Sequence, residues 1–576
     1  MGTTMYYLAL ASDYDGTIAE HGAVDQATFD ALCELKRSGR RLILVSGREL
    51  PDLQRAFPEL ELFDLAVLEN GGLLYEPATR TETVLGEPPP AALVERLQAE
   101  GVEPLSVGRC IVATWTPHEH TVLAAIRELG LELQIIFNKG AVMVLPPGVN
   151  KASGLHAALE RLGISAHNVV GVGDAENDHA FLAECGVPVA VANALPALKE
   201  AAEIVTEAPR GAGVAELVAA MLANDLDDPR AALRRRVPFA RPVDGGDAAA
   251  MIELDPRDGA TLIAGISGGG KSTIATTVLE RFVERGFQFC VIDPEGDYGE
   301  FKGAVVLGDA QQPPALEDVV ELLGPRMENV VVNLLGFDID ERPGFLARLL
   351  PEIQRLRAQV GRPQWLLIDE AHHMFPREWV PAEAVVPECL PATLMITVHP
   401  ESLAPKLAQT ATTVLAVGSD PKRVLEEFAE VSGKPVGEVP AAPLEPRHGI
   451  LWRDGKVQEV EVDPPKERLK RHVRKYAQGD LGPDRSFYFR GPDGKLNLRA
   501  NNLMIFLQIA EGVDDETWLF HLQNGDYARW FEGAVKDDRL AKEVRELPEQ
   551  ADPATSRRAV KEAIERLYTV AVKAQD

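Results

Sequence analysis

Two aspartates separated by one residue, Asp13 and Asp15, stand in the segment SDYDGT, directly after an apolar run near the start of the chain. A strand that ends in a tight turn is where an open α/β sheet presents reactive groups. Of two such carboxylates, one can attack phosphorus to form an aspartyl-phosphate, while the other protonates the leaving oxygen and then activates water. Because paired anions facing a phosphate repel each other, we expect Mg²⁺ at this site.

The other groups that this chemistry needs follow in order along the chain. Ser46 ends the apolar run RLILVS and can donate a hydrogen bond to a phosphoryl oxygen, and Lys151 in GVNKASGL can hold nucleophile and phosphate together. The candidates are Ser46, Gly47 and Arg48 for the substrate phosphate, Lys151 as a catalytic cation, and Asp13, Asp15, Asp174 and Asp178 for the metal. A lone Asp-x-Asp pair is usually an ordinary acidic loop, but four motifs in this order favour a phosphatase.

This series of motifs resembles the haloacid-dehalogenase superfamily, in its branch of sugar-phosphate and phosphoglycolate phosphatases, over about residues 5–220. The segment ENGG at residues 69–72 adds local similarity. The resemblance implies Asp13 as nucleophile, Asp15 as general acid/base, and a cap inserted at about residues 75–147 that selects the substrate. The cap is short for this branch, which favours a small organic, sugar-type phosphate as substrate.

A second phosphate-binding motif begins at Gly265. The segment GISGGGKST, between an expected strand and an expected helix, matches the P-loop pattern G-x-x-x-x-G-K-S/T. Its glycines allow backbone N–H groups to close on phosphate oxygens, Lys271 reaches the terminal phosphates, and Ser272 can bind Mg²⁺. The candidate ATP-binding residues are Gly265, Gly268, Gly269, Gly270, Lys271, Ser272, Thr273, Asp369 and His399.

The segment WLLIDEAHH supplies the acidic partner of the P-loop. Asp369 would contact the magnesium shell, and Glu370 can polarise a water against the γ-phosphate, which favours an ATP hydrolase over a kinase. His399 in LMITVHP is a candidate for sensing that phosphate. Adjacent side chains on a helix or turn point apart, so we do not expect His372 and His373 to share a metal ion.

Together with VIDPEGDY at residues 291–298, these segments resemble the HerA/FtsK-like ATPases of DNA translocation over about residues 245–455. The resemblance implies a RecA-like core with the glutamate as base, and a homo-oligomer, often a hexameric ring. A ring would need an arginine that reaches the neighbouring nucleotide, and Arg423 and Arg447 are candidates by position.

The composition and the order of motifs predict an α/β protein of several domains. At 576 residues the chain is too long for one core, and five scattered cysteines without a CxxC pair fit a reducing cytoplasm. No apolar run is long enough for a membrane span. We expect a Rossmann-like phosphatase domain with a small α+β cap at 1–222, a linker at 223–247, a RecA-like P-loop domain at 248–460, and a small α+β or mostly helical accessory domain at 461–576.

Basic and aromatic residues cluster in two further places. Arg234, Arg235, Arg236 and Arg241, with residues 466–476, are the dense basic stretches of a chain with a formal net charge of −29. We interpret them as solvated faces paired with acids, and the alternative is a track for a phosphate polymer. A group of aromatic residues near the end of the chain is expected to form a compact core instead of a stacking surface for bases: Phe487, Tyr488, Phe489, Trp518, Phe520, Tyr527, Trp530 and Phe531.

Four functions remain open from the sequence. The first is a phosphatase acting on a phosphorylated small molecule, with an ATP-dependent module that regulates or assembles it. The second is a nucleic-acid enzyme in which a DNA motor is coupled to an end-processing phosphatase, and the third a polynucleotide kinase–phosphatase, which Glu370 disfavours. In the fourth, the ATP site is only an assembly switch. The acidic composition and the short cap favour the first.

Overall fold

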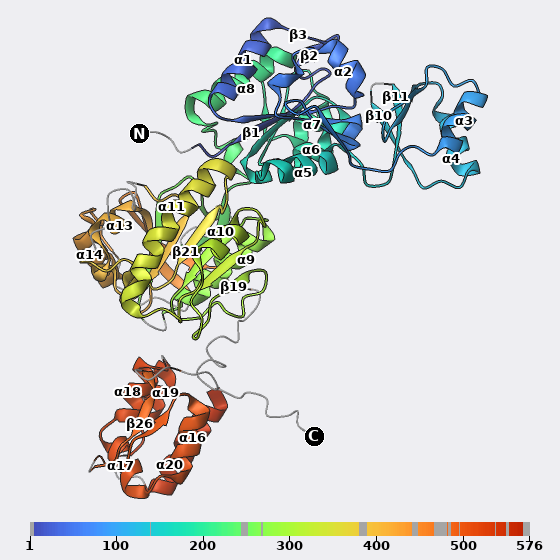
Figure 1. Ribbon diagram of the computed structural model, residues 1–576. Coiled ribbons are helices and arrows are strands. Elements are labelled where there is room, and N and C mark those ends of the chain that lie inside the picture. The colour runs from blue at the N-terminus through green and yellow to red at the C-terminus, as the bar shows by residue number, and fades with distance from the viewer. Residues whose placement is uncertain are drawn as a thin grey trace.

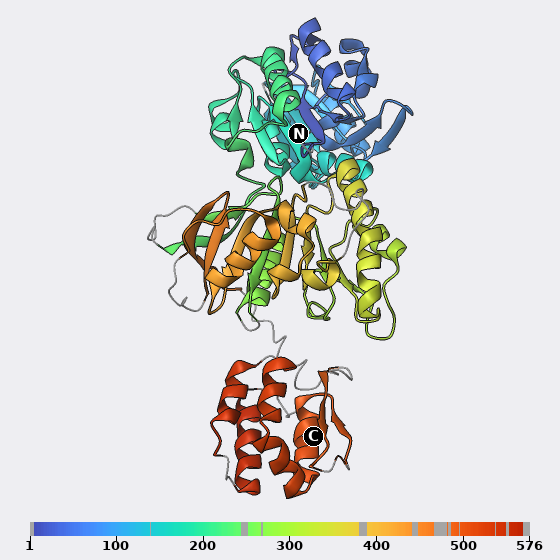
Figure 2. The same ribbon diagram turned by 90° about the vertical axis from the view of Figure 1, so that its left-hand side faces the viewer.

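The computed structural model describes the chain except for residues 1–4, 139, 244–250, 267–268, 379–388, 440–446, 466–480, 482–484, 493, 495, 536, 549–551 and 568–576. Three bodies follow one another along the chain (Figures 1 and 2), two built on sheets and a third that is mainly helical. Within the described residues, no helix combines the length and the apolar character that crossing a membrane requires.

The first body is built on a sheet whose strands, among the described residues and in spatial order, are β14 (Ile204–Val205), β13 (Val187–Ala190), β12 (Val169–Gly173), β1 (Ala9–Asp13), β4 (Arg41–Val45), β5 (Leu65–Leu68), β6 (Leu73–Glu76) and β7 (Thr81–Val84). The strands from β14 to β5 are parallel, and β6 and β7 are antiparallel. Because β1, β4 and β12 run in the same direction, their carboxyl ends meet at one edge.

Helices cover both faces of this sheet, as expected where parallel strands are buried on both sides. They are α1 (Gln26–Arg37), α2 (Leu50–Ala56), α5 (Lys151–Leu162), α6 (His179–Glu184), α7 (Pro196–Ala201) and α8 (Arg210–Asn224). In Figure 1, α1 and α8 lie on one side of the sheet and α5 and α6 on the other. A short hairpin of β2 (Ala19–Glu20) and β3 (Ala23–Val24) follows β1.

A small antiparallel sheet forms the cap, in the order β10 (Gln134–Asn138), β11 (Ala141–Leu145), β9 (Val112–Trp115) and β8 (Ser106–Val107). Alternate residues of these strands, such as Val142 and Val144, pack in a core with α3 (Ala91–Ala99) and α4 (Glu119–Glu128). The other face carries Ile111 and Met143, which belong to a separate small cluster. The period of two along the strands therefore gives the cap one helix-covered face and one face that is free of helices.

The second body is built on a larger sheet, described in the order β16 (Ile252–Leu254), β15 (Val237–Pro242), β25 (Lys456–Val462), β24 (His448–Arg453), β23 (Ala411–Val417), β17 (Ala260–Gly265), β22 (Thr393–Thr397), β21 (Trp365–Ile368), β18 (Phe289–Asp293), β20 (Val330–Asn333) and β19 (Val305–Leu307). The strands from β23 to β19 are parallel, and an antiparallel extension continues from β24. The helices of this body are α9 (Lys271–Glu284), α10 (Leu316–Leu323), α11 (Arg342–Val360), α12 (Ala371–Met374), α13 (Pro405–Thr410) and α14 (Pro421–Ser432).

The third body combines a short hairpin, β26 (Phe487–Phe489) and β27 (Leu498–Ala500), with α16 (Leu503–Gly512), α17 (Asp515–Gln523), α18 (Asp526–Gly533), α19 (Asp538–Arg545) and α20 (Pro553–Leu567). Its aromatic core is confirmed, because Phe487, Phe489, Trp518, Tyr527, Trp530 and Phe531 are buried, whereas Tyr488 and Phe520 are partly exposed. Asp552 precedes α20, and its carboxylate accepts hydrogen bonds from the N–H and the hydroxyl of Thr555.

Residues 223–247, expected as a linker from their proline, glycine and charge, include β15, a strand of the second sheet. Its Val237 and Phe239 are buried in the core of the second body. Just before β15, the Arg235 guanidinium donates hydrogen bonds to Asp255 at 2.9 Å and to the Tyr7 hydroxyl of the first body at 3.1 Å. Burial of apolar side chains thus makes part of this segment a joint between the two bodies.

The basic stretch around this joint pairs with acids, as we interpreted it. Arg234 donates to Glu203 at 2.8 Å, and Arg241 contacts Asp463 at 3.1 Å. The second basic stretch, residues 466–476, lies outside the described residues. The described arginines of the first stretch are therefore committed to intramolecular ion pairs.

Replacing Arg235 with methionine should lower the free energy of unfolding by about 3 kcal/mol, because it removes the buried guanidinium that donates to both oxygens of Asp255. The buried carboxylate then retains one guanidinium contact, from Arg236 at 3.3 Å. The control is Arg230→Met, which removes an exposed ion pair with Asp228 and should cost less than about 1 kcal/mol. Chemical denaturation, followed by circular dichroism, measures both changes. Equal midpoints for the two variants would contradict the role given to Arg235.

Candidate functional site

The first site lies at the carboxyl edge of the first sheet, where several elements end or begin. β1 ends at Asp13, and β12 is followed directly by Asp174. α5 begins at Lys151, because the side-chain oxygen of Asn150 accepts the N–H groups of Ala152 at 2.9 Å and of Ser153 at 3.1 Å. The N-terminal turn of α5 therefore fixes the lysine opposite the strand ends.

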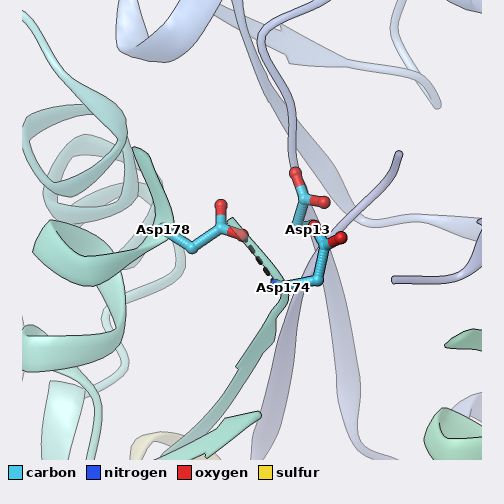
Figure 3. Close-up of side chains that lie close together, drawn as sticks. All are labelled: Asp13, Asp174 and Asp178. Carbon is cyan, nitrogen blue, oxygen red and sulfur yellow. Dashed lines mark hydrogen bonds between the residues drawn. The ribbon is translucent and has the colours of Figure 1, made fainter. Parts of the chain in front are cut away.

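Lys151 bridges two carboxylates at this edge. Its Nζ donates to Oδ1 of Asp13 and to Oδ1 of Asp178, both at 2.6 Å. The other oxygen of Asp178 accepts the N–H groups of Asp174 and Ala175, both at 2.9 Å, and Figure 3 shows the first of these bonds. All four titratable side chains are buried, so water screens their interactions poorly.

The three aspartates fit a hard divalent cation. One oxygen from each of Asp13, Asp174 and Asp178 lies within 4.8 Å of the other two. Burial, and then repulsion by Asp178, raises the pKa of Asp13 to about 7, although Lys151 opposes the rise. A divalent cation would relieve this repulsion, and carboxylate oxygens are the ligands that Mg²⁺ prefers.

Asp15 lies apart from this group. Its two oxygens accept hydrogen bonds from Nε and Nη2 of Arg48, both at 2.7 Å, and Arg48 also donates to Asp52 at 2.7 Å. The carboxylate of Asp15 is therefore outside the three-aspartate group proposed for the metal, and Arg48 contacts acids instead of opening toward a phosphate. Ser46 is buried beside them, with its Oγ accepting the N–H of Arg48 at 3.2 Å.

Two asparagines that the motif analysis did not assign also lie at the site. Asn177 Nδ2 donates to Oδ1 of Asn70 at 3.1 Å, and Asn70 Nδ2 contacts Sδ of Met143 in the cap at 3.8 Å. Asn70 is buried and has a left-handed φ of 56°. The pair links the edge of the first sheet to the helix-free face of the cap.

The turn that carries Asn70 explains the segment ENGG. Gly71 has a φ of 105°, and a Cβ there would lie 1.9 Å from the carbonyl oxygen of Asn150. Buried Glu69 accepts the N–H groups of Arg109 at 3.0 Å and of Cys110 at 2.8 Å, which ties the turn to the cap connection. Glycine at position 71 thus indicates, already in the sequence, that the backbone of this turn passes close to the backbone beside Lys151.

The second site lies at the carboxyl end of β17, where α9 begins. Lys271 Nζ donates to the carbonyl oxygens of Gly265 at 2.7 Å and Ile266 at 2.9 Å. Gly270 precedes α9 with a φ of 94°, and Gly265 packs so closely that a Cβ would lie 2.1 Å from a backbone oxygen. Gly268 lies outside the described residues.

A cavity of about 440 Å³ adjoins this loop. It is lined by Gly269, Ser272, Thr273, His448 and Asp463, among others. Arg447 lines it as well, so this arginine adjoins the P-loop of its own chain. The other arginine candidate, Arg423, contacts Glu427 at 2.6 Å.

Acidic side chains gather where β21 and β18 end. Burial, and then repulsion by Glu370, raises the pKa of Asp369 well above its usual range, with further contributions from Asp293, Glu295 and Asp297. β22 separates β21 from β17. The acids and the P-loop therefore share one edge of the sheet, with the strand that leads to Thr397 between them.

The histidines near Glu370 are arranged differently from our expectation. The rings of His372 and His373 lie 4.1 Å apart, so the prediction that they point apart is wrong. His372 Nδ1 lies 3.1 Å from the Thr397 hydroxyl and 3.5 Å from Glu370 Oε2. His399 is 55% exposed and contacts Glu401 at 3.1 Å. The side chain of His372 therefore lies beside the Glu370 carboxylate, and the His373 N–H donates to the Glu370 carbonyl oxygen at 2.8 Å.

The comparisons with known proteins match two parts of the chain. The family described as haloacid dehalogenase-like hydrolase matches residues 10–97 and 123–218, and the family described as Helicase HerA, central domain, matches residues 260–373. A phosphoglycolate phosphatase of Methanothermobacter thermautotrophicus is 33% identical over 220 residues, which are 36% of this chain and 96% of that protein.

Two further proteins show the same local similarity. Phosphoglycolate phosphatase 2 of Saccharolobus solfataricus is 31% identical over 227 residues, 38% of this chain and 94% of its own. A solved haloacid dehalogenase-like hydrolase from Bacteroides thetaiotaomicron is 19% identical, with a TM-score of 0.33, and covers 37% of this chain and 99% of its own.

Magnesium should stabilise the phosphatase part of the chain, because it neutralises the three buried aspartates. At a hundredfold excess over its dissociation constant, the ion should add about 2.7 kcal/mol to the stability of that part, which thermal unfolding with and without Mg²⁺ measures. Asp174→Asn should lose most of this gain, whereas Asp228→Asn, at an exposed ion pair, should retain it. A full Mg²⁺ effect in Asp174→Asn would contradict the assignment.

Proposed function

Because this chain belongs to the haloacid dehalogenase-like hydrolases, we propose that it hydrolyses small organic phosphate monoesters through an aspartyl-phosphate on Asp13, in a Mg²⁺-dependent reaction. The observation that carries this proposal is the bridge of Lys151 between Asp13 and Asp178, both at 2.6 Å, in the group of three buried aspartates. A carboxylate held in this way is aligned to attack, and Lys151 beside it offsets part of the negative charge of the aspartates and of an incoming phosphate.

In the first step, an oxygen of Asp13 forms a bond to phosphorus while the bond from phosphorus to the leaving oxygen breaks. Asp15 gives its proton to that leaving oxygen. Lys151 stays beside the nucleophile and offsets negative charge that develops on the phosphoryl oxygens. Mg²⁺, bound by Asp13, Asp174 and Asp178, would neutralise the phosphate and orient it.

In the second step, Asp15 takes a proton from water, and the resulting hydroxide attacks phosphorus and releases the Asp13 carboxylate. Arg48 controls when the Asp15 carboxylate can transfer a proton, because it donates hydrogen bonds to both oxygens of Asp15 in the structure. The guanidinium must release at least one oxygen before Asp15 can transfer a proton. We propose that the incoming phosphate draws Arg48 away from Asp15 and so frees the acid at the moment of binding, with Ser46 and Gly47 as further phosphate contacts.

The substrate is proposed to be small and of the sugar type. Met143 of the cap contacts the amide of Asn70, so the cap reaches the edge of the sheet beside the candidate site. Amide groups such as those of Asn70 and Asn177 suit the hydroxyl groups of a sugar or a hydroxy acid. The curated relatives described above are named phosphoglycolate phosphatases, which is consistent with a small phosphorylated acid or sugar.

The HerA-like part is proposed to bind and hydrolyse ATP. Its P-loop, with Lys271 and Ser272, would hold the phosphates and Mg²⁺ together with Asp369, and Glu370 would polarise the attacking water, with His372 placed to orient the glutamate. We propose that this part regulates or assembles the phosphatase within a homo-oligomer. The four arginines of the first basic stretch are paired with acids, so these described residues give no support to a track for nucleic acid.

Asp13→Asn should abolish phosphatase activity on p-nitrophenyl phosphate, with a loss of at least about 10³-fold, because it removes the nucleophile. ATP hydrolysis by the same variant should remain within about twofold of the wild type. Asp30→Asn, an exposed change on α1, is the control and should leave both activities unchanged. Survival of the phosphatase activity in Asp13→Asn would refute the nucleophile assignment.

Glu370→Gln should give the opposite pattern. ATP should still bind, because the P-loop is intact, but hydrolysis should slow by about 10²-fold or more through loss of the general base. Glu352→Gln, a partly exposed position on α11, serves as the control for both measurements. Loss of ATP binding in Glu370→Gln, measured by calorimetry, would count against a purely catalytic role for this glutamate.

A further inference from the structure

The first two bodies meet where the loop between α5 and β12 packs against the segments that lead into β18 and β21. The ring of His167 stacks on Phe287, with centroids 4.0 Å apart and an interplanar angle of 20°. Gln364 Nε2 lies 3.3 Å from Oδ1 of Asn168, to which it donates a hydrogen bond. We call this contact region, formed by residues 163–168 of the first body and by residues 286–288 and 361–364 of the second, the seam. It includes specific polar and aromatic contacts between the two folded bodies.

This seam lies at the opposite ends of the strands from the two candidate sites. On one side, α5 starts at Lys151 and β12 leads to Asp174, and on the other side β21 leads to Asp369. A strand of four or five residues spans about 13–17 Å. The two sites consequently face away from each other, and the seam touches the far ends of elements that carry residues of both.

A polar cavity of about 190 Å³ lies within the seam, lined by Ser165, Phe287, Gln288, Asn329, Arg362 and Gln364, among others. Its size is below the roughly 300–1,000 Å³ of pockets for drug-sized ligands, so a nucleotide would not fit. A water molecule takes about 30 Å³ in the liquid, so the space exceeds that of one bound water. A small polar molecule matches these limits.

Arg362 brings a positive charge to this cavity and has no acidic partner in the part of the chain that the structure describes. Its Nε is buried and has no hydrogen-bond partner, and its terminal Nη2 lies at 3.4 Å from the carbonyl oxygen of Ile164. Burial lowers its pKa, and no carboxylate of the described residues counteracts the effect. Nearby His167 stays neutral, because burial lowers its pKa to about 4. A partly buried guanidinium with unmet donors calls for an anion.

Gln288 offers a hydrogen-bond acceptor in the same cavity. Both donors of its side-chain amide are used, by the carbonyl oxygens of Leu323 and Glu328, whereas its Oε1 is buried and accepts no hydrogen bond. An orphan acceptor beside an orphan cation fits a ligand that has anionic oxygens and one hydroxyl group. Ser165 adds a hydroxyl whose oxygen already accepts the N–H of His167 at 3.3 Å, leaving its proton available to donate.

We propose that this cavity binds inorganic phosphate in a protonated form, with Arg362 and Ser165 donating to its anionic oxygens and Gln288 accepting from its hydroxyl group. Binding of phosphate to this cavity does not depend on the proposed function. The proposed function would supply the phosphate, because both phosphate-ester and ATP hydrolysis release this ion. A phosphate bound in the cavity would contact both the loop after α5, through Ser165, and the segment before β21, through Arg362. Phosphate thereby stabilises the seam and reports the turnover of each site to the other.

Titration calorimetry of the full chain with inorganic phosphate, in EDTA and without nucleotide, tests the proposal. Without a cation, the three aspartates repel phosphate, so the seam site is favoured. Arg362→Gln should weaken binding at this site by at least about tenfold, because a charge-assisted hydrogen bond is lost. The matched control is Arg355→Gln, an exposed arginine on α11, which should bind as the wild type does.

A comparison of sulfate with phosphate distinguishes this phosphate site from a site that binds any anion. At neutral pH sulfate has no proton to donate to Gln288, so it should bind about tenfold more weakly than phosphate. Equal phosphate binding by wild type and Arg362→Gln would overturn the proposal, and so would equal affinity for phosphate and sulfate. If Arg362→Gln fails to fold, Ser165→Ala and Arg362→Lys replace it, and unchanged affinity in both would be equally decisive.

The proposed function and the seam site can fail separately. Phosphatase activity with p-nitrophenyl phosphate should persist in Arg362→Gln, since Asp13 and Lys151 are untouched, while its response to added phosphate should change. In the wild type, phosphate should shift the rate in a way that simple competition with the substrate does not describe. Purely competitive inhibition, the same in wild type and Arg362→Gln, would refute the regulatory role and leave the phosphatase assignment standing.

Discussion

The close approach of three buried carboxylates at the end of the first sheet is the constraint from which the rest of the site follows. Asp13, Asp174 and Asp178 come within 4.8 Å of one another in a poorly screened environment. Such a group is stable only with compensating charge, and Lys151 provides part of it from the first turn of α5. The backbone N–H groups that hold Asp178 provide more. The negative charge that remains on the three aspartates is what a bound divalent cation would neutralise.

The same constraint recurs in the second sheet with a different solution. Asp369 also lies among carboxylates at a strand end, and Lys271 of the P-loop donates to carbonyl oxygens of its own loop. A lysine on backbone carbonyls exchanges readily for phosphate oxygens, whereas a lysine between two aspartates is fixed. The first site is therefore preorganised by its protein charges, whereas the second site would be organised by the nucleotide and ion that we propose it binds.

Much of this arrangement could be predicted, because the motifs of both sites follow strands and because parallel strands bring their carboxyl ends together. The family and the α/β class are confirmed on this basis. Contacts that depend on side-chain direction could not be predicted. The pairing of Arg48 with Asp15, and the position of His372 beside Glu370, depend on turns whose φ values no motif specifies. The polar composition of residues 223–247 likewise hid the burial of β15.

The two sheet-based bodies meet at the amino ends of their strands, which has a physical consequence for how the two candidate sites communicate. A direct transfer of phosphate between the sites is disfavoured, because each opens at the carboxyl edge of its own sheet and the seam lies at the amino ends. Coupling must then pass through rigid strands and α5, or through a ligand that changes the seam itself. Rigid elements transmit little unless their packing has two states. The partly buried guanidinium of Arg362 has no carboxylate partner among the described residues, so the seam is incomplete without an anion. An incomplete interface is one that a small ligand can switch.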